Sequence, residues 1–447
     1  MEGKLRVCII LVSFSLGSTQ DPGQPLYLTP YIETGRIQEA RAAAKVDFLL
    51  EGLVSYSGYL TVDKELNSNL FFWFFPSEQC WTSRPVILWL QGGPGASSLL
   101  GLLYENGPIR LTKEELRRNP FSWSQNHNVI YIDNPVGTGF SFTNSSDGYP
   151  RTQKPIGEGI YKALMQFFTL FSELKNNVFF LTGESYAGKY IPSTALTIHK
   201  KNKMAKQKIN LQGLFIGNGL VDPINMLHYG EYLYQLGLID MNGKLMFKNY
   251  ETIIKQHIEA TRWTQATNTF SLMVMDYYYS ENFTLFNNLT GLSQHYNYIN
   301  DKENYDLQSF VTNNTIRKLI HVGNIKFDDG RMLANAMRED IMKSMKTVVE
   351  VLLEHYEILF YNGQLDIICA YPLSENVLSG LQWTKKNEFE QAERTIWKVD
   401  GVLAGYCKTG GRLTEVMVRN AGHLVPTDQP KWALQLITNF TSGLQCS

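Results

Sequence analysis

Short runs of consecutive apolar residues recur along the chain. They occupy residues 56–62, 70–75, 86–90, 129–132, 178–181, 211–216, 358–361 and 416–418. Several are apolar throughout, as strands are when helices cover both faces of a sheet. Residues 156–174 instead carry Ile160, Leu164 and Phe168 at helical spacing, which predicts a helix with a packed face. The alternation of strands and helices predicts an α/β fold, with a mostly parallel central sheet flanked by helices.

The strand rhythm stops between residues 222 and 350. This segment is rich in Asn and Tyr and contains amphipathic, helix-like stretches. These features predict a largely helical insertion that caps the active site, and they argue against a free-standing domain. The expected organisation is a signal peptide at 1–19, a core formed by 20–221 and 351–447, and a cap insertion at 222–350.

The N-terminus has the layout of a signal peptide. Lys4 and Arg6 precede an apolar stretch at residues 7–16, and small residues follow it. That stretch is too short to span a bilayer, and no later segment reaches about 18 uninterrupted apolar residues. We therefore expect no membrane span, and a protein of the secretory pathway that ends in the lysosome or outside the cell.

The composition narrows the possible partners. The 447 residues are 44% hydrophobic and 13% aromatic, which suffices for a large core, and the formal net charge is −1 without any charged block. Nucleic acid is therefore a poor candidate partner. No Cys or His spacing typical of a metal site occurs, so neither a metal nor a cofactor is expected. A homodimer stays open.

Glycosylation sequons and cysteines agree with secretion. The sequons begin at Asn144, Asn282, Asn288, Asn313 and Asn439. Removal of the signal peptide would take Cys8 with it and leave an even number of cysteines, namely Cys80, Cys369, Cys407 and Cys446. Four cysteines allow three pairings, and the sequence does not choose between them. A Cys369–Cys407 disulfide is the pairing we favour, because both lie near the loops discussed below.

The candidate nucleophile is Ser185. An apolar run leads into Gly183-Glu184-Ser185-Tyr186-Ala187-Gly188. Gly-x-Ser-x-Gly after a strand is typical of the sharp strand-to-helix turn that exposes the serine hydroxyl in α/β-hydrolases, so we expect an α/β-hydrolase fold. This signal is modest alone, so three further motifs are needed to support it.

A serine hydroxyl needs a histidine base and a carboxylate that orients the base. In α/β-hydrolases these follow the serine in the order acid, then histidine, on loops after later strands. Asp366 follows the apolar run 358–361 and a turn, and His423 follows the run 416–418 and a turn. The sequence therefore predicts Ser185, Asp366 and His423 as a catalytic triad.

The chemistry also needs backbone N–H groups directed at the developing oxyanion. The loop Gln91-Gly92-Gly93-Pro94-Gly95 follows the apolar run 86–90, and its glycines permit close backbone approach. We assign the oxyanion hole to the N–H groups of Gly93 and Tyr186.

Four segments together carry a family resemblance. They are Trp89-Leu90-Gln91-Gly92-Gly93-Pro94-Gly95-Ala96-Ser97-Ser98, Asp133-Asn134-Pro135-Val136-Gly137-Thr138-Gly139-Phe140-Ser141, Gly183–Gly188 and Gly422-His423-Leu424-Val425-Pro426. With them the chain resembles the serine carboxypeptidases over nearly its whole mature length. The segments 21–32 and 69–76 most resemble the vitellogenic-like branch.

The resemblance implies release of single residues from the C-termini of peptides at acid pH. It also implies that Gln91, the Gly92 backbone, Glu105 and Glu184 hold the free carboxylate of the substrate. Two neighbouring carboxyls do not easily ionise together, so one stays protonated at acid pH and can donate a hydrogen bond. Affinity for a C-terminus should then fall as the pH rises.

Two positions depart from the family pattern. The family usually has Asn where this chain has Gln91, and one extra methylene could weaken or alter carboxylate binding. The family often has Cys where this chain has Ala96, so a disulfide from this loop to the inserted region is not expected.

Two other functions stay open. An acyltransferase or esterase could use the same acyl-enzyme and pass it to another acceptor. A protective binding partner of other lysosomal proteins is a non-catalytic alternative, although an intact triad argues against a role without catalysis.

Overall fold

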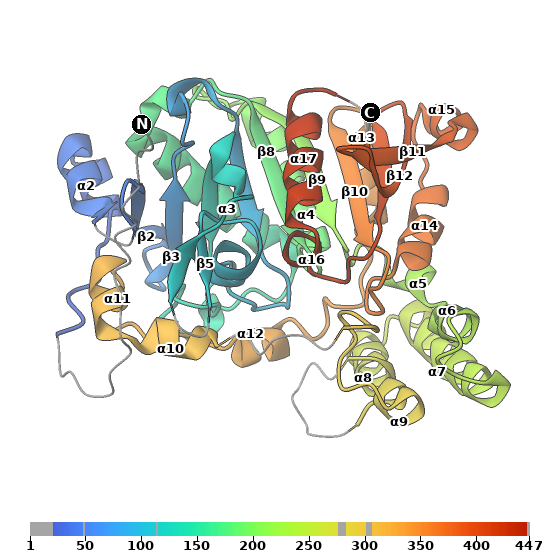
Figure 1. Cartoon of the computed structure of the whole chain (residues 1–447). Helices are drawn as coiled ribbons and strands as arrows, with labels where there is room; N and C mark the ends of the chain where they lie inside the picture. The colour runs from blue at the N-terminus through green and yellow to red at the C-terminus, as the bar shows by residue number, and fades with distance from the viewer. Residues whose placement is uncertain (1–20, 48–49, 113–114, 276–282, 301–305, 445–447) are drawn as a thin grey trace.

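The strands form one large sheet. The computed structural model describes residues 21–47, 50–112, 115–275, 283–300 and 306–444, so the predicted signal peptide lies outside the described part. Within these residues an 11-stranded sheet has the order β1-β2-β3-β7-β4-β8-β9-β10-β13-β12-β11 (Figure 1). The strands of this sheet are β1 (Lys45–Val46), β2 (Ser55–Asp63), β3 (Ser68–Phe75), β4 (Val86–Leu90), β7 (Asn128–Ile132), β8 (Phe179–Glu184), β9 (Leu211–Gly217), β10 (Glu357–Gly363), β11 (Arg394–Val399), β12 (Val402–Gly410) and β13 (Leu413–Val418). A separate small hairpin pairs β5 (Ile109–Leu111) with β6 (Leu116–Arg118).

The centre of the sheet is parallel and its two flanks are antiparallel. Neighbours are parallel from β7 through β4, β8, β9 and β10 to β13. The pairs formed by β1, β2, β3 and β7, and by β13, β12 and β11, are antiparallel. Strands β4 and β7 are buried along their whole length, as their uninterrupted apolar runs predict. The expected α/β-hydrolase architecture is confirmed.

Alternate residues of the strands enter two buried clusters on opposite faces of the sheet. Phe72 and Phe74 of β3 belong to one cluster, whereas Phe71 and Trp73 belong to the other. The predicted helix at 156–174 is α3 (Gln153–Leu170), which packs on α4 (Ala187–Asn202) over the first face. Helix α17 (Pro430–Thr441) packs on the second face. Other helices of the core are α1 (Thr29–Glu33), α2 (Ile37–Ala44), α13 (Lys346–Leu353), α14 (Tyr371–Ser379), α15 (Lys386–Gln391) and α16 (Val425–Asp428).

Besides α13, the segment between β9 and β10 contains a succession of helices. These are α5 (Pro223–Met226), α6 (Tyr229–Gln235), α7 (Met241–Glu259), α8 (Trp263–Met273), α9 (Leu285–Thr290), α10 (Leu307–Thr312), α11 (Asn314–Leu319) and α12 (Arg331–Ala336). Helices α6 to α9 project beyond the sheet, at the lower right of Figure 1, and α10 to α12 run back along its lower edge. Phe310 and Ile316 share a buried cluster with Trp73 of β3, so the later part of the insertion packs on the core itself.

The predicted Cys369–Cys407 disulfide is wrong. Cys407 is disulfide-bonded, whereas Cys369 is a buried free thiol and Cys80 an exposed one. Cys369 and Cys407 belong to buried clusters on opposite faces of the sheet, so closeness to the active-site loops in sequence did not bring them together. Cys8 and Cys446 lie outside the described residues.

Among the described residues, no helix combines the length and apolarity needed to cross a membrane. Nor do three or more His, Cys, Asp or Glu side chains of the described residues gather in an arrangement that could hold a metal ion.

Candidate active site

Ser185 stands in the sharp turn between β8 and α4. Strand β8 ends at Glu184, helix α4 begins at Ala187, and Ser185 has a φ of 62°, which a non-glycine residue rarely adopts. The glycines on both sides are needed for space: a Cβ on Gly183 would meet Leu90 O at 2.1 Å, and one on Gly188 would meet Gly219 Cα at 2.9 Å. The predicted strand-to-helix turn is therefore present, and close backbone packing explains its glycines.

The loop after β4 lies directly against this turn. A Cβ on Gly92 would come within 2.5 Å of Tyr186 N and 2.6 Å of Ser185 Cβ, so only glycine fits there. Gly93, with a φ of 109°, continues the loop. The two predicted oxyanion donors, Gly93 and Tyr186, thus belong to backbone segments in contact with each other.

Asp133 fixes the far end of the same loop. Its carboxylate accepts hydrogen bonds from Ser97 Oγ (2.6 Å), Ser98 N (2.9 Å) and Phe140 N (2.8 Å). Burial raises the pKa of Asp133 to about 6 against the effect of these bonds. The segment that begins at Asp133 is therefore a clamp on the loop that precedes the nucleophile.

The predicted acid and base are in direct contact. His423 Nδ1 lies 2.8 Å from Asp366 Oδ2, and both side chains are buried. Backbone bonds to this carboxylate come from the N–H of Ile368 (2.9 Å, to Oδ1) and the N–H of Cys369 (3.3 Å, to Oδ2). A carboxylate held in this way selects the imidazole tautomer that has its proton on Nδ1.

Asn218 links Asp366 to the turn at Ser185, and the sequence analysis did not identify it. Its Nδ2 donates to Asp366 Oδ2 at 2.6 Å. Its neighbour Gly217 accepts a hydrogen bond from the N–H of Ser185 at 3.0 Å. The available signal was Gly217-Asn218-Gly219 directly after an apolar run, the same strand-end position that marks the other site residues.

The side chains predicted to bind a carboxylate meet beside Ser185. Gln91 Nε2 donates to Glu184 Oε1 at 2.6 Å and to Glu105 Oε1 at 3.3 Å. Its Oε1 accepts from Trp89 Nε1 at 2.9 Å, so both ends of the amide are held. Gln91, Glu105 and Glu184 are all buried, so the two acids share one amide away from solvent.

Two buried groups border these acids. Burial raises the pKa of the Tyr361 hydroxyl well above its usual range, and the charges of Glu184 and Glu105 add to the effect. Burial likewise raises the pKa of the Cys369 thiol, followed by the charges of Asp366 and Glu184. Both groups therefore stay protonated and neutral over the physiological range.

A buried ion pair ties the nucleophile turn to the inserted region. Lys189 of α4 lies 3.0 Å from Asp340 Oδ2, and the Tyr186 hydroxyl (2.7 Å) and Gln153 Nε2 (2.5 Å) donate to the same oxygen. Burial lowers the pKa of Lys189. Burial would raise the pKa of Asp340, but the charge of Lys189 and these hydrogen bonds bring it below its usual range. Neither Asp340 nor Lys189 stood out in the sequence.

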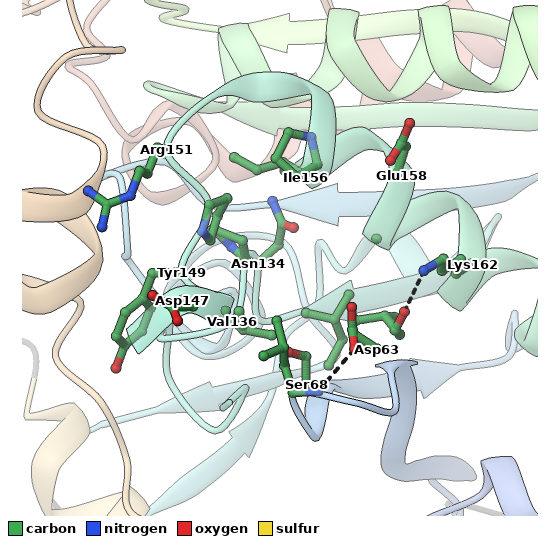
Figure 2. A pocket seen from close by; sticks show the side chains of 18 of the residues that line it. Asp63, Ser68, Asn134, Val136, Asp147, Tyr149, Arg151, Ile156, Glu158 and Lys162 are labelled. Carbon is green, nitrogen blue, oxygen red and sulfur yellow. Dashed lines mark hydrogen bonds between the residues drawn. The ribbon is translucent and has the colours of Figure 1, made fainter. Parts of the chain in front are cut away.

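A separate cavity of about 410 Å³ lies beside the β2–β3 hairpin, the loop after β7 and the start of α3. Figure 2 shows Asn134, Tyr149 and Ile156 among its lining side chains. None of the predicted triad, oxyanion or carboxylate-binding residues lines it. It is therefore distinct from the candidate active site.

Comparison with known proteins agrees with this geometry. A family model described as serine carboxypeptidase matches residues 49–443. The chain belongs to the serine carboxypeptidase family. A venom serine carboxypeptidase of Apis mellifera is 48% identical over 94% of this chain and 92% of its own. A probable serine carboxypeptidase of Homo sapiens, CPVL, is 42% identical over 96% of this chain and 92% of its own.

The fold comparison extends to a solved carboxypeptidase. The crystal structure of Kex1, a prohormone-processing carboxypeptidase of Saccharomyces cerevisiae, has a TM-score of 0.76 at 26% identity and covers 90% of this chain and 96% of its own. The predicted activity of a serine-type carboxypeptidase is thereby confirmed at the level of family and fold.

The two departures from the family pattern have local solutions in this serine carboxypeptidase. The longer Gln91 side chain still reaches both Glu184 and Glu105. Next to Ala96, Gly95 packs so closely on Gly330 of the insertion that a Cβ on Gly95 would lie 2.7 Å from Gly330 Cα. Backbone packing therefore joins this loop to the insertion where a disulfide was not expected.

Proposed function

We propose that this serine carboxypeptidase removes single residues from the free C-termini of peptides at acid pH, through an acyl-enzyme on Ser185. The observation that carries the proposal is the buried contact of Gln91 with Glu184 and Glu105. Glu184 is the residue immediately before Ser185. A site built only for amide or ester hydrolysis has no need of two buried acids on one amide at this position.

In the proposed reaction, Ser185 Oγ attacks the carbonyl carbon of the last peptide bond and its proton passes to His423 Nε2. Asp366 holds the opposite ring nitrogen, and the N–H groups of Gly93 and Tyr186 receive the negative oxygen. Collapse breaks the C–N bond, and the leaving amine takes the proton from His423. Water then attacks the ester by the same route and restores the Ser185 hydroxyl.

The carboxylate of the departing residue would bind at Gln91, the Gly92 backbone, Glu105 and Glu184. Both N–H groups of the Gln91 amide point at glutamates, so a donor for the substrate must come from a protonated acid or from a rearranged amide. A proton shared by the two acids supplies that donor at acid pH, and its loss at neutral pH leaves negative charge facing the substrate.

The first test is mass spectrometry of N-blocked peptides at about pH 5. Peptides with free and amidated C-termini are incubated with the protein and with Ser185→Ala. We expect loss of single C-terminal residues from free-acid peptides only, and none in the variant. Transfer to an added alcohol or amine in place of hydrolysis would support the acyltransferase alternative. No serine-dependent reaction, with an unaltered lysosomal partner retained by Ser185→Ala, would support the binding alternative.

The acid preference is tested with Glu184→Gln. Glutamine donates at any pH, so kcat/KM should fall less between pH 5 and pH 7.5 than in the parent, with the ratio of the two values changed by about tenfold. Glu393→Gln, at an exposed position remote from these groups, is the control. A parent-like pH profile in Glu184→Gln would count against a shared proton.

We also propose that the protein enters the secretory pathway and acts in the lysosome or outside the cell. Support comes from the signal-peptide pattern, from the similarity to a venom carboxypeptidase, and from the exposed sequon residues Asn144 and Asn288. Asn313 caps α11 and Asn439 is half-buried on α17, while Asn282 lies outside the described residues. N-terminal sequencing and glycosidase treatment of the expressed protein test cleavage after residue 19 and the glycans; sedimentation tests the possible homodimer.

A further inference from the structure

A short segment of the insertion, His295-Tyr296-Asn297-Tyr298, lies against both the loop that carries Asp366 and the loop that carries His423. We call residues 295–298 the strap. On the acid loop, the N–H of Ile367 donates to His295 O at 3.1 Å, and the N–H of Tyr298 donates to Leu365 O at 3.2 Å. The strap therefore grips the residues on either side of Asp366.

The strap also holds the backbone of the histidine. The N–H of His423 donates to Tyr296 O at 2.6 Å, and the ring of Tyr296 lies 5.2 Å from the imidazole, tilted by 36°. A direct backbone bond also joins the acid and histidine loops, from Leu365 N to Ala421 O at 2.7 Å. The strap adds bonds to each loop, so it fixes their separation.

Asn297 is the side chain that holds this contact together. It is 3% exposed, and its Nδ2 donates to Asp428 Oδ2 at 3.1 Å. The same oxygen accepts the N–H of Gly422 at 2.6 Å, next to His423. The Asn297 Oδ1 accepts the N–H groups of residues 299 and 300, both at 3.1 Å, which shapes the strap itself.

Gly422 is explained by the same contact. A Cβ at this position would lie 2.3 Å from Tyr296 O and 2.7 Å from Asn297 Cβ, so any other residue would push the strap away. The glycine before the histidine is thus required by the insertion rather than by the turn alone.

We propose that Asn297 is a positioning residue: through Asp428 and Gly422 it holds the His423 backbone so that the imidazole keeps its place between Asp366 and Ser185. This inference rests on the proposed function, in which His423 is the general base. It makes the insertion part of the catalytic apparatus on the histidine side. Neither Asn297 nor Asp428 touches the reacting atoms in this account.

The test compares Asn297→Ala with Asn300→Ala. Asn300 is the same residue type in the same segment, but its side chain is exposed. Because small misplacement of a catalytic group is costly, we expect kcat of Asn297→Ala to fall about 10- to 100-fold with KM changed less than about threefold. Peptide and ester substrates should lose rate equally, because both need the base. Asn300→Ala should match the parent.

Asp428 variants separate positioning from folding. Asp428→Asn keeps an oxygen that can accept from both Asn297 and Gly422, so it should retain most activity, whereas Asp428→Ala should resemble Asn297→Ala. The double alanine variant should be no worse than about the poorer single, because both act through one contact. Three results would each overturn the proposal: a parent-like kcat in Asn297→Ala, full additivity in the double variant, or a rise in KM without a fall in kcat in Asn297→Ala.

The reaction of Ser185 with a fluorophosphonate, followed as a mass increase, keeps this test separate from the proposed function. It needs the base but no peptide carboxylate. If the parent is labelled but trims no peptide, the carboxypeptidase proposal fails and slower labelling of Asn297→Ala still supports the strap. If the parent and Asn297→Ala are labelled at equal rates, the strap proposal fails alone.

Discussion

The serine side and the histidine side of the active site contact the same insertion through different kinds of interaction. On the serine side the contact is a buried charge: Asp340 faces Lys189 and the Tyr186 hydroxyl. On the histidine side it consists of backbone bonds and one neutral amide, from Tyr296 and Asn297. A buried ion pair is expensive to break from one end. Truncating a side chain of the strap, in contrast, leaves its backbone bonds in place.

The difference separates what each side can tolerate. Replacing one member of the ion pair leaves an uncompensated charge, so the serine side should respond mainly in stability. Loosening the strap leaves its backbone bonds available, so the histidine side should respond mainly in rate. Four further experiments test this contrast.

The largest effect is expected from Asp366→Asn. The amide retains the shape of the carboxylate but no longer selects the tautomer with its proton on Nδ1, and kcat should fall about 10⁴-fold. Peptide and ester kinetics with an unchanged melting temperature check this. A loss of stability equal to the loss of rate would mean that Asp366 chiefly holds the fold.

Lys189→Met should be the most damaging change on the serine side for stability. It leaves the Asp340 carboxylate buried without its cation, at a cost of about 3–5 kcal/mol in the free energy of unfolding. Adding Asp340→Asn should recover part of this loss by removing the charge. Urea unfolding of the parent, Lys189→Met and the double variant measures the loss and its recovery. Exposed ion pairs contribute about 0–1 kcal/mol. If Lys189→Met unfolds within about 1 kcal/mol of the parent, the pair is not sealed from water.

Tyr186→Phe should have a smaller effect on the same side. It removes one hydrogen bond to Asp340 and keeps the backbone N–H that we assign to the proposed oxyanion hole, so we expect a loss of about 1 kcal/mol in stability and of about 2- to 10-fold in kcat. Tyr161→Phe on α3 is the control. A fall in kcat near that of Asp366→Asn would instead give the hydroxyl a direct role.

Glu415→Gln should have the smallest effect, away from both sides. Burial, followed by the charge of Glu375, raises the pKa of Glu415 to about 7. Its contribution to stability is therefore fully present below the usual pKa of the unfolded chain, about 4.5, and is lost as the pH rises through about 7. Relative to the parent, the variant should gain a few degrees more in melting temperature at pH 8 than at pH 5. Equal shifts at both values would contradict the raised pKa.

Local patterns were sufficient to predict the centre of this fold, and they also nominated the candidate site residues that lie on it. Strands β4, β7 and β8 are buried on both faces, so their sequences are apolar without interruption. The turn at Ser185 can be recognised in the sequence because close packing requires glycines on both sides of it. The hairpin of β11 and β12 was missed, because β11 is mostly exposed and lacks an apolar run.

Contacts between distant segments were beyond such patterns. Asn218, Asp340 and Asn297 are ordinary polar residues in sequence, and only the fold brings them to Asp366, Tyr186 and Asp428. The same limit explains the wrong cysteine pairing, which judged closeness along the chain and not the face of the sheet. The cap role of residues 222–350 stays a prediction, although residues 307–322 pack on the core.

The place of β13 in the sheet has a consequence for biosynthesis. It is the last strand of the chain, yet it lies inside the sheet, between β10 and β12, and leads directly into the loop of His423. The β11–β12 hairpin is made earlier but has no partner strand until β13 arrives. A nascent chain thus carries Ser185 long before His423, so the proposed triad is complete only after β13 has been made.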